Sequence, residues 1–98
     1  MRIPHLAWDH RHDVAALTVS FANRIWHRRE VADLILGYNA TGRLARIVVL
    51  EASRWLPQGA GPPEALEAVR AILDGHVRAE DLAVVESAME RATARRSH

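Results

Sequence analysis

The chain has 98 residues, of which 49% are hydrophobic and 26% are charged, and its formal net charge is +1. This length and apolar content predict one small globular domain and argue against a disordered chain. The lack of cysteine excludes a disulfide framework, a thiolate metal site and a cysteine nucleophile, and no apolar run is long enough to span a bilayer.

The first third of the chain predicts three strands. The N-terminal residues lack the apolar core of a signal peptide, so we expect a cytoplasmic location. Ile3 to Trp8 is expected at a sheet edge, since Pro4 cannot donate a hydrogen bond to a neighbouring strand. Val14 to Phe21 alternates apolar and polar residues, as a half-buried strand does. Arg24 to Val31 is expected to be the third strand, after a tight turn at Ala22-Asn23.

The clearest pattern is a β-hairpin in which Leu34 to Tyr38 and Arg43 to Glu51 flank the loop Asn39-Ala40-Thr41-Gly42. Asn suits the first position of the turn and Gly the left-handed position that follows. The second strand is apolar on both faces, with Leu44, Val48 and Leu50 beside Arg46 on one and Ala45, Ile47 and Val49 on the other. Such strands are usually covered on both faces, so we expect the C-terminal tail to lie over the second face.

The pattern of residues 3–56 resembles a bacterial domain-of-unknown-function family, the one numbered 2283. The similarity is carried by Trp8-Asp9, Asp13, the strand Ala16 to Val19, Leu34 to Tyr38, Gly42-Arg43-Leu44, Ile47 to Leu50 and Glu51-Ala52-Ser53. The chain departs from the family pattern at Val48, where a Glu is usual, and at Gly37, where an acidic residue is frequent. The resemblance implies a fold type and an antitoxin-like or partner-neutralising role, and it implies no catalytic residues.

The C-terminal part predicts two helices. Ala52 to Leu56 suggests one helical turn, and the Pro- and Gly-rich residues 57–62 suggest a linker. A helix is expected from Pro62-Pro63 to Gly75, and a second from about Ala79 to Ala94, with Leu82, Val85, Met89 and Ala92 on its apolar side. The whole chain is therefore expected to be one α+β domain, with an antiparallel meander of four or five strands in residues 1–56 and a helical hairpin in residues 63–96.

One polar cluster, Asp9-His10-Arg11-His12-Asp13, could present His and Asp ligands to a divalent ion. The other histidines show no metal-ligand spacing, so we favour a solvated turn in which the aspartates cap the backbone. A metal-dependent enzyme using His10 and His12 is the weakest hypothesis. The chain has no nucleophile–base motif and no phosphate-binding loop, so we expect neither enzymatic activity nor a cofactor.

A second cluster could bind nucleic acid through Arg24, Trp26, Arg28, Arg29, Arg43 and Arg46. Residues 1–56 carry a net charge of +3, and residues 57–98 carry −2. Strand alternation sends Trp26 and Arg28 to one face and Arg29 to the other, which favours a solvated edge strand protected by its charges. A nucleic-acid-binding regulator is therefore the second hypothesis.

The hypothesis that we favour is a small protein-interaction module, regulatory or antitoxin-like, that self-associates as a homodimer. A domain of this size buries only about two-thirds of its unfolded surface, and a second copy would complete its core. The candidate interface residues are Trp55, Val48, Leu50, Leu82, Val85 and Met89. For Trp55 we also weigh the simpler alternative of packing against the helical tail.

Overall fold

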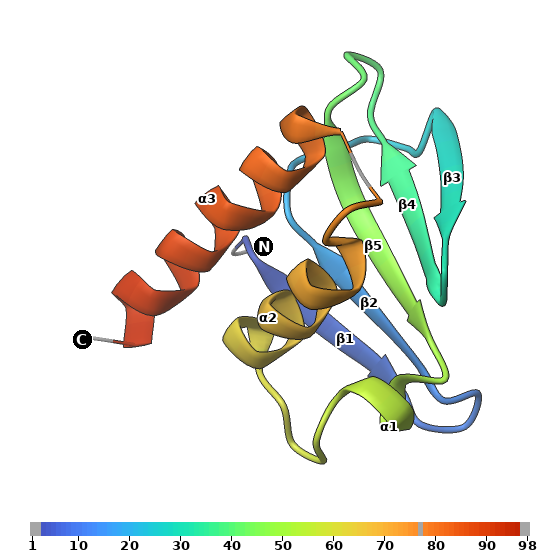
Figure 1. The fold of residues 1–98 in the computed structure, drawn as a ribbon, viewed down its shortest axis with the longest axis vertical. Helices are drawn as coiled ribbons and strands as arrows, with labels where there is room; N and C mark the ends of the chain where they lie inside the picture. Colours follow the sequence, from blue (N-terminus) through green and yellow to red (C-terminus); the bar gives the residue numbers. More distant parts are fainter. Residues whose placement is uncertain (1–2, 77, 97–98) are drawn as a thin grey trace.

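The computed structural model describes residues 3–76 and 78–96, which form a five-stranded antiparallel sheet with three helices (Figure 1). The strands are β1 (His5–Asp9), β2 (Val14–Thr18), β3 (His27–Val31), β4 (Leu34–Tyr38) and β5 (Leu44–Leu50). The helices are α1 (Ala52–Trp55), α2 (Pro62–Leu73) and α3 (Ala79–Arg96). The predicted α+β class, with a C-terminal helical region, is confirmed.

The strand order is β1-β2-β5-β4-β3, so the sheet is not one continuous meander. β5 pairs with both β2 and β4 at the centre of the sheet. Residues 19–26, which we call the connecting segment, therefore run from β2 across the ends of β5 and β4 to the far edge, behind the sheet in Figure 1. The prediction of a tight turn at Ala22-Asn23 is wrong, because β3 does not pair with β2.

The β4–β5 hairpin has the loop chemistry that its sequence predicts. The Asn39 Oδ1 atom accepts hydrogen bonds from the Thr41 N–H (3.0 Å) and the Arg43 N–H (3.1 Å), and Gly42 has a φ of 81°. An irregularity of register opposite Tyr38 buries Leu44 and Ala45 together. For this reason Leu44 lies in the core, and not on the face of Val48 as expected.

The core lies between one face of the sheet and the helices. Leu17, Leu36 and Ile47 of the sheet are fully buried, as are Leu66 and Val85 of α2 and α3. Fully burying each such side chain contributes about 1.5–3 kcal/mol relative to leaving it exposed.

The helical tail covers the face of Ile47 and Val49. No helix of the described residues covers the face of Val48 and Leu50, although a strand that is apolar on both faces is usually covered on both. Both helices lie on the same side of the sheet in Figure 1.

The buried stripe of α3 is rotated from its predicted position. It consists of Asp81, Val84, Val85, Ala88 and Ala92. Only Val85 and Ala92 of the predicted apolar side are fully in the core. Leu82 and Met89 are partly exposed, because they lie at the margins of the surface that faces α2 and the sheet.

Short polar contacts attach α1 to the turns at the lower end of the sheet. The Asp13 carboxylate accepts hydrogen bonds from the Ser53 N–H (2.9 Å) and hydroxyl (2.6 Å), and the Asp13 carbonyl accepts one from the Ala52 N–H (2.8 Å). Asp13 thereby caps a helix 40 residues away in the chain. The Trp55 indole N–H donates to Asp33 at 3.0 Å, which fixes the other end of the helical turn.

Candidate interaction surface

The face of the sheet that points away from the helices, here called the outer face, has an apolar centre. Strand alternation and pairing place four side chains opposite one another across the sheet: Ala7, Ala16, Val48 and Ile35. Val14 and Leu50 form a parallel row beside them. In the part of the chain that the structure describes, no helix lies over this face (Figure 1). An apolar row that solvent reaches is typical of a surface that binds a partner.

The two ends of the outer face differ in charge. At the upper end, near the β4–β5 loop, one cross-strand row contains His5, Arg46 and Arg28. At the lower end the corresponding row begins with Asp9 at the β1 edge. Glu30 ends the central row at the β3 edge. The outer face is therefore cationic at one end of the strands and has a carboxylate at the other.

The connecting segment crosses the upper end of the outer face. Ile25 lies over Gly37, so close that a Cβ atom built on Gly37 would come within 3.1 Å of the Ile25 side chain. The absence of a side chain at Gly37 is what allows the segment to approach the sheet there. The segment forms a raised ridge above the upper row.

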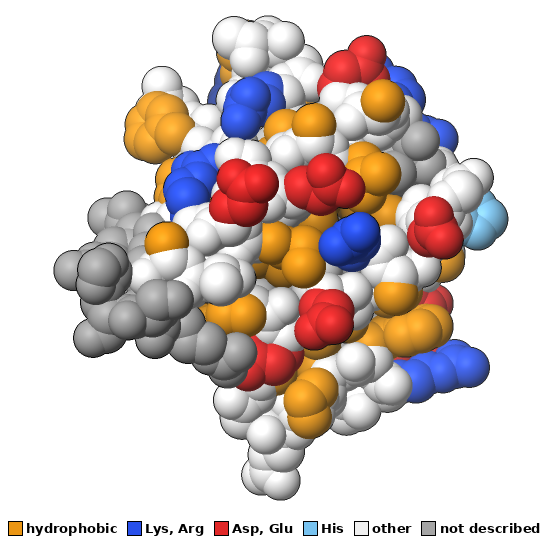
Figure 2. Space-filling model, turned by 60° about the vertical axis from the view of Figure 1, so that its left-hand side comes forward, with side chains coloured by type: hydrophobic (Ala, Val, Ile, Leu, Met, Phe, Trp, Pro, Cys, Tyr) orange, Lys and Arg blue, Asp and Glu red, His pale blue; other side chains and the backbone are white. Residues whose placement is uncertain are grey.

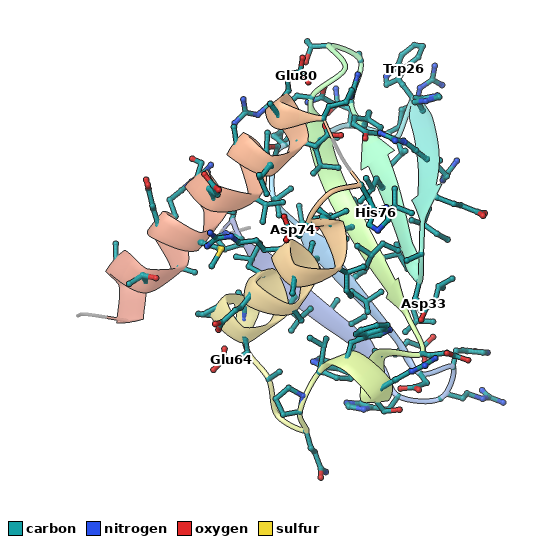
Figure 3. The ribbon with its side chains drawn as sticks, viewed as in Figure 1. Trp26, Asp33, Glu64, Asp74, His76 and Glu80 are labelled. Atoms are coloured by element: carbon teal, nitrogen blue, oxygen red, sulfur yellow. The ribbon has the colours of Figure 1, made fainter. Side chains whose placement is uncertain are left out.

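The ridge carries two exposed aromatic side chains, Phe21 (74% exposed) and Trp26 (59% exposed). Trp26 projects from the chain just before β3 (Figure 3), and the Arg24 guanidinium lies 3.9 Å from the centre of its ring. This cation–π contact holds the indole in place at the surface.

The predicted interface residues do not form one surface. Val48 and Leu50 lie on the outer face, and Leu50 and Trp55 are each 37% exposed. Val85 is fully buried in the core, which excludes it from an interface in this fold. The Trp55 indole N–H donates to Asp33 in the turn between β3 and β4, which places Trp55 at the lower end of the sheet.

Leu82 and Met89 belong to the opposite side of the molecule, where open hollows run between α2 and α3. Met89 lines a hollow of about 640 Å³ with Arg70, Glu86 and Glu90. Leu82 lines an adjacent one that also includes Arg70 and Glu86. Acidic side chains surround patches of apolar atoms on this helical side of the molecule (Figure 2).

The candidate nucleic-acid residues are only partly brought together. Arg28 and Arg46 lie on the outer face on either side of Gly37, and Arg24 and Trp26 lie in the adjoining connecting segment. Arg43 donates to the Ser20 hydroxyl at 3.1 Å.

Arg29 points to the helical side, where it reaches the His76 carbonyl at 3.4 Å. The predicted separation of Arg28 and Arg29 is confirmed by their register with Gly37 and Leu36.

His10 and His12 have different neighbours. The His10 ring stacks on Trp8, with ring centres 5.1 Å apart and planes inclined by 7°. His12 bonds through Nδ1 to the Asp9 carboxylate at 2.8 Å, and this hydrogen bond lowers the pKa of Asp9. Within residues 3–76 and 78–96, no cluster of three or more His, Asp or Glu side chains could hold a metal ion.

A buried polar contact between the sheet and α3 is not evident from the sequence. The Tyr38 hydroxyl donates to the Asp81 carboxylate at 2.7 Å, and Asp81 is only 1% exposed. The Arg78 guanidinium lies 3.4 Å from the other Asp81 oxygen and 5.3 Å from the centre of the Tyr38 ring. Burial and the adjacent Asp81 carboxylate raise the pKa of Tyr38, and the bond to Asp81 raises the pKa of Arg78. We call these three residues the latch.

The latch could have been anticipated only in part. Tyr38 lies on a strand that faces the core, and a buried tyrosine hydroxyl usually has a partner. Asp81, however, lies in the first turn of a helix, where an acidic residue is equally explained by the helix dipole. The two residues are 43 positions apart, and no local pattern connects them.

Comparison with known proteins adds no relative to these observations: no protein-family model, curated protein or solved structure matches the chain. The resemblance to the family numbered 2283 therefore remains a prediction. None of the helices in the described residues combines the length and the apolar character needed to cross a bilayer.

Proposed function

We propose that the protein is an interaction module that self-associates through the outer face of its sheet. The observation that carries this proposal is the apolar row of Ala7, Ala16, Val48 and Ile35, which the helices of its own chain leave uncovered. A sheet face of this composition is normally packed against a second layer. A second copy of the chain supplies such a layer without a further protein.

The expected association is weak. Four strand spacings and five residues along each strand give a patch of about 19 Å by 17 Å. Two such patches together bury roughly 650 Å², well below the about 1,200 Å² at which stable specific interfaces begin, so the dimer should be weak and should exchange readily with the monomer. Self-association is then concentration-dependent, as in a regulatory protein that responds to its own abundance. A regulatory or antitoxin-like role rests on this behaviour and on the family resemblance.

The test is sedimentation equilibrium of the whole chain over a concentration series that extends to the highest soluble concentration. Val48→Glu introduces a charge at the centre of the outer face and should abolish association, because the carboxylate would lose its water in the dimer. The matched control is Ala83→Glu, at an exposed position of α3, which should associate as the unmodified chain does. A monomer at every concentration would refute the proposal, as would equal association of the two variants.

A second candidate function, nucleic-acid binding, is favoured by the exposed Trp26 with Arg24 on its ring and Arg28 and Arg46 nearby. Aromatic rings stack on unpaired bases, and arginines bind the phosphates. Fluorescence anisotropy with a labelled single-stranded oligonucleotide tests it over a range of salt concentrations. Binding through this cluster should weaken with salt, and the salt slope should decrease for Arg28→Gln and Arg46→Gln. The absence of binding at low salt would exclude this function.

A further inference from the structure

We infer that the second copy packs on the outer face with its central strand antiparallel to that of the first, about a two-fold axis that is perpendicular to the strands and passes near Val48. This inference rests on the proposed self-association and specifies its geometry. β5 is the central strand of the sheet, so its copy meets it in any symmetric arrangement centred on the apolar row. Two orientations are then possible, with the two β5 strands parallel or antiparallel.

The charges of the outer face favour the antiparallel orientation. A parallel arrangement would place Arg46 against Arg46 of the partner subunit, and the row of His5 and Arg28 against itself. Like charges that face each other with little water between them repel each other and disfavour such an arrangement. An antiparallel arrangement places Arg46 and Arg28 against the lower row of the partner, where Asp9 lies at the β1 edge opposite the partner's His5. Its one like-charged pair is Glu30 against Glu30 of the partner subunit, at the outer end of the central row on the β3 edge.

The shape of the outer face favours the same orientation. The ridge of the connecting segment, with Ile25 over Gly37, rises only at the upper end. In the parallel orientation the two ridges would meet and hold the apolar rows apart. In the antiparallel orientation each ridge lies beside the lower end of the other copy, and the apolar rows can reach the separation of about 10 Å that is usual for packed sheets.

The antiparallel orientation also provides an apolar neighbour for Leu50. Positions 46 and 50 are equidistant from Val48 along β5, so Arg46 of one copy lies over the partner's Leu50. An arginine can cover an apolar side chain with its methylene stem while its guanidinium remains in water. Leu50, which is 37% exposed in the single chain, would be covered in this way.

Cysteine cross-linking distinguishes the orientations, because the chain has no cysteine of its own. Four single variants are made: Arg46→Cys, Val48→Cys, Leu50→Cys and, as an exposed control on α3, Ala83→Cys. Each is treated with a short bis-maleimide that spans the about 10 Å between packed sheets. Arg46→Cys is also mixed with a size-tagged Leu50→Cys chain, and the products are separated by mass.

The inference requires a several-fold excess of the mixed 46–50 product over the 46–46 and 50–50 products, with strong cross-linking of Val48→Cys. An excess of the 46–46 and 50–50 products would overturn the orientation and leave self-association intact. Val48→Cys that cross-links no more than Ala83→Cys would overturn self-association through the outer face itself. A lack of preference between the mixed and unmixed products would mean that the copies meet without a fixed orientation, which also refutes the inference.

Discussion

Replacement of Tyr38 by phenylalanine tests whether the latch holds α3 on the sheet. The substitution keeps the buried ring and removes only the hydroxyl, which donates to Asp81 at 2.7 Å. A hydrogen bond to a charged group contributes about 1.5–3 kcal/mol. Asp81 would retain only the longer contact to Arg78, at 3.4 Å, whose side chain is 55% exposed. The expected loss in the free energy of unfolding is therefore about 2 kcal/mol.

Urea unfolding followed by circular dichroism measures this loss. A slope of about 2 kcal/mol per M, within the range for small proteins, converts it into a midpoint about 1 M lower. Thr41→Val is the matched control, because it also removes one hydroxyl donor, but from an exposed hydrogen bond to Asn39. We expect the control to lose no more than about 0.5 kcal/mol.

Equal losses of free energy in the two variants would show that the buried hydrogen bond to Asp81 contributes no more than the exposed one. An unchanged urea midpoint for Tyr38→Phe would likewise contradict the prediction. It would mean that the hydrogen bond from the Tyr38 hydroxyl to the buried Asp81 carboxylate does not stabilise the fold. A change in the urea slope would instead indicate that unfolding is no longer two-state and that the helices detach before the sheet unfolds.

Three further predictions concern local features. Tyr38 is the single tyrosine of the chain, and because its pKa is raised in the folded state, its ionisation at 295 nm should occur at a higher pH in the folded chain than in urea. The corresponding stability is complete below the usual pKa of about 10 and is lost as the pH rises through the folded-state value, a dependence that should be absent in Tyr38→Phe. Asp13→Ala removes the cap on Ser53 at a position with φ 54°, so thermal melting should show a loss of about 1–2 kcal/mol, and an equally stable variant would exclude a capping role. Gly37→Ala forces Ile25 to move by a few tenths of an ångström, which should lower the free energy of unfolding by about 1 kcal/mol. Adding Ile25→Val should recover part of this loss, as measured by a double-mutant cycle. Additive losses in that cycle would show that the ridge does not rest on Gly37.

The local structure was largely predictable because its signals lie within short segments. The Asn39 to Gly42 loop determines a hairpin through its own side-chain and glycine chemistry. The helices begin and end close to the predicted residues, since proline and glycine mark their limits. The α+β class follows from these elements.

The long-range arrangement was less predictable. Apolar alternation indicates which residues share a face of a strand, but it does not indicate which strands are neighbours. For this reason the position of β5 between β2 and β4 was not predicted. Because β5 is apolar on both faces, its sequence does not show which face the helices leave uncovered. The structure decides between the faces through large side chains such as Leu36 and Leu17, which are fully buried, while the outer face has Ala16 and Gly37 at the neighbouring positions.

The candidate surface was only half visible in the sequence. Val48 and Leu50 were recognised because they follow the period of a strand. The ridge was not recognised, because its position depends on a glycine in one strand that accepts an isoleucine from a distant loop. The partial assembly of Arg24, Arg28 and Arg46 depends on the same path of the chain.

The central position of β5 also constrains the order in which the sheet can assemble during synthesis. The first hairpin, β1–β2, leaves the ribosome more than 25 residues before β5, its only other neighbour in the described sheet, is complete. Until Leu50 has emerged, β2 presents an unpaired edge, and the two halves of the sheet cannot join. The last strand to be made is therefore the one that closes the sheet, and a nascent chain halted before it would carry an open strand edge of the kind that promotes aggregation.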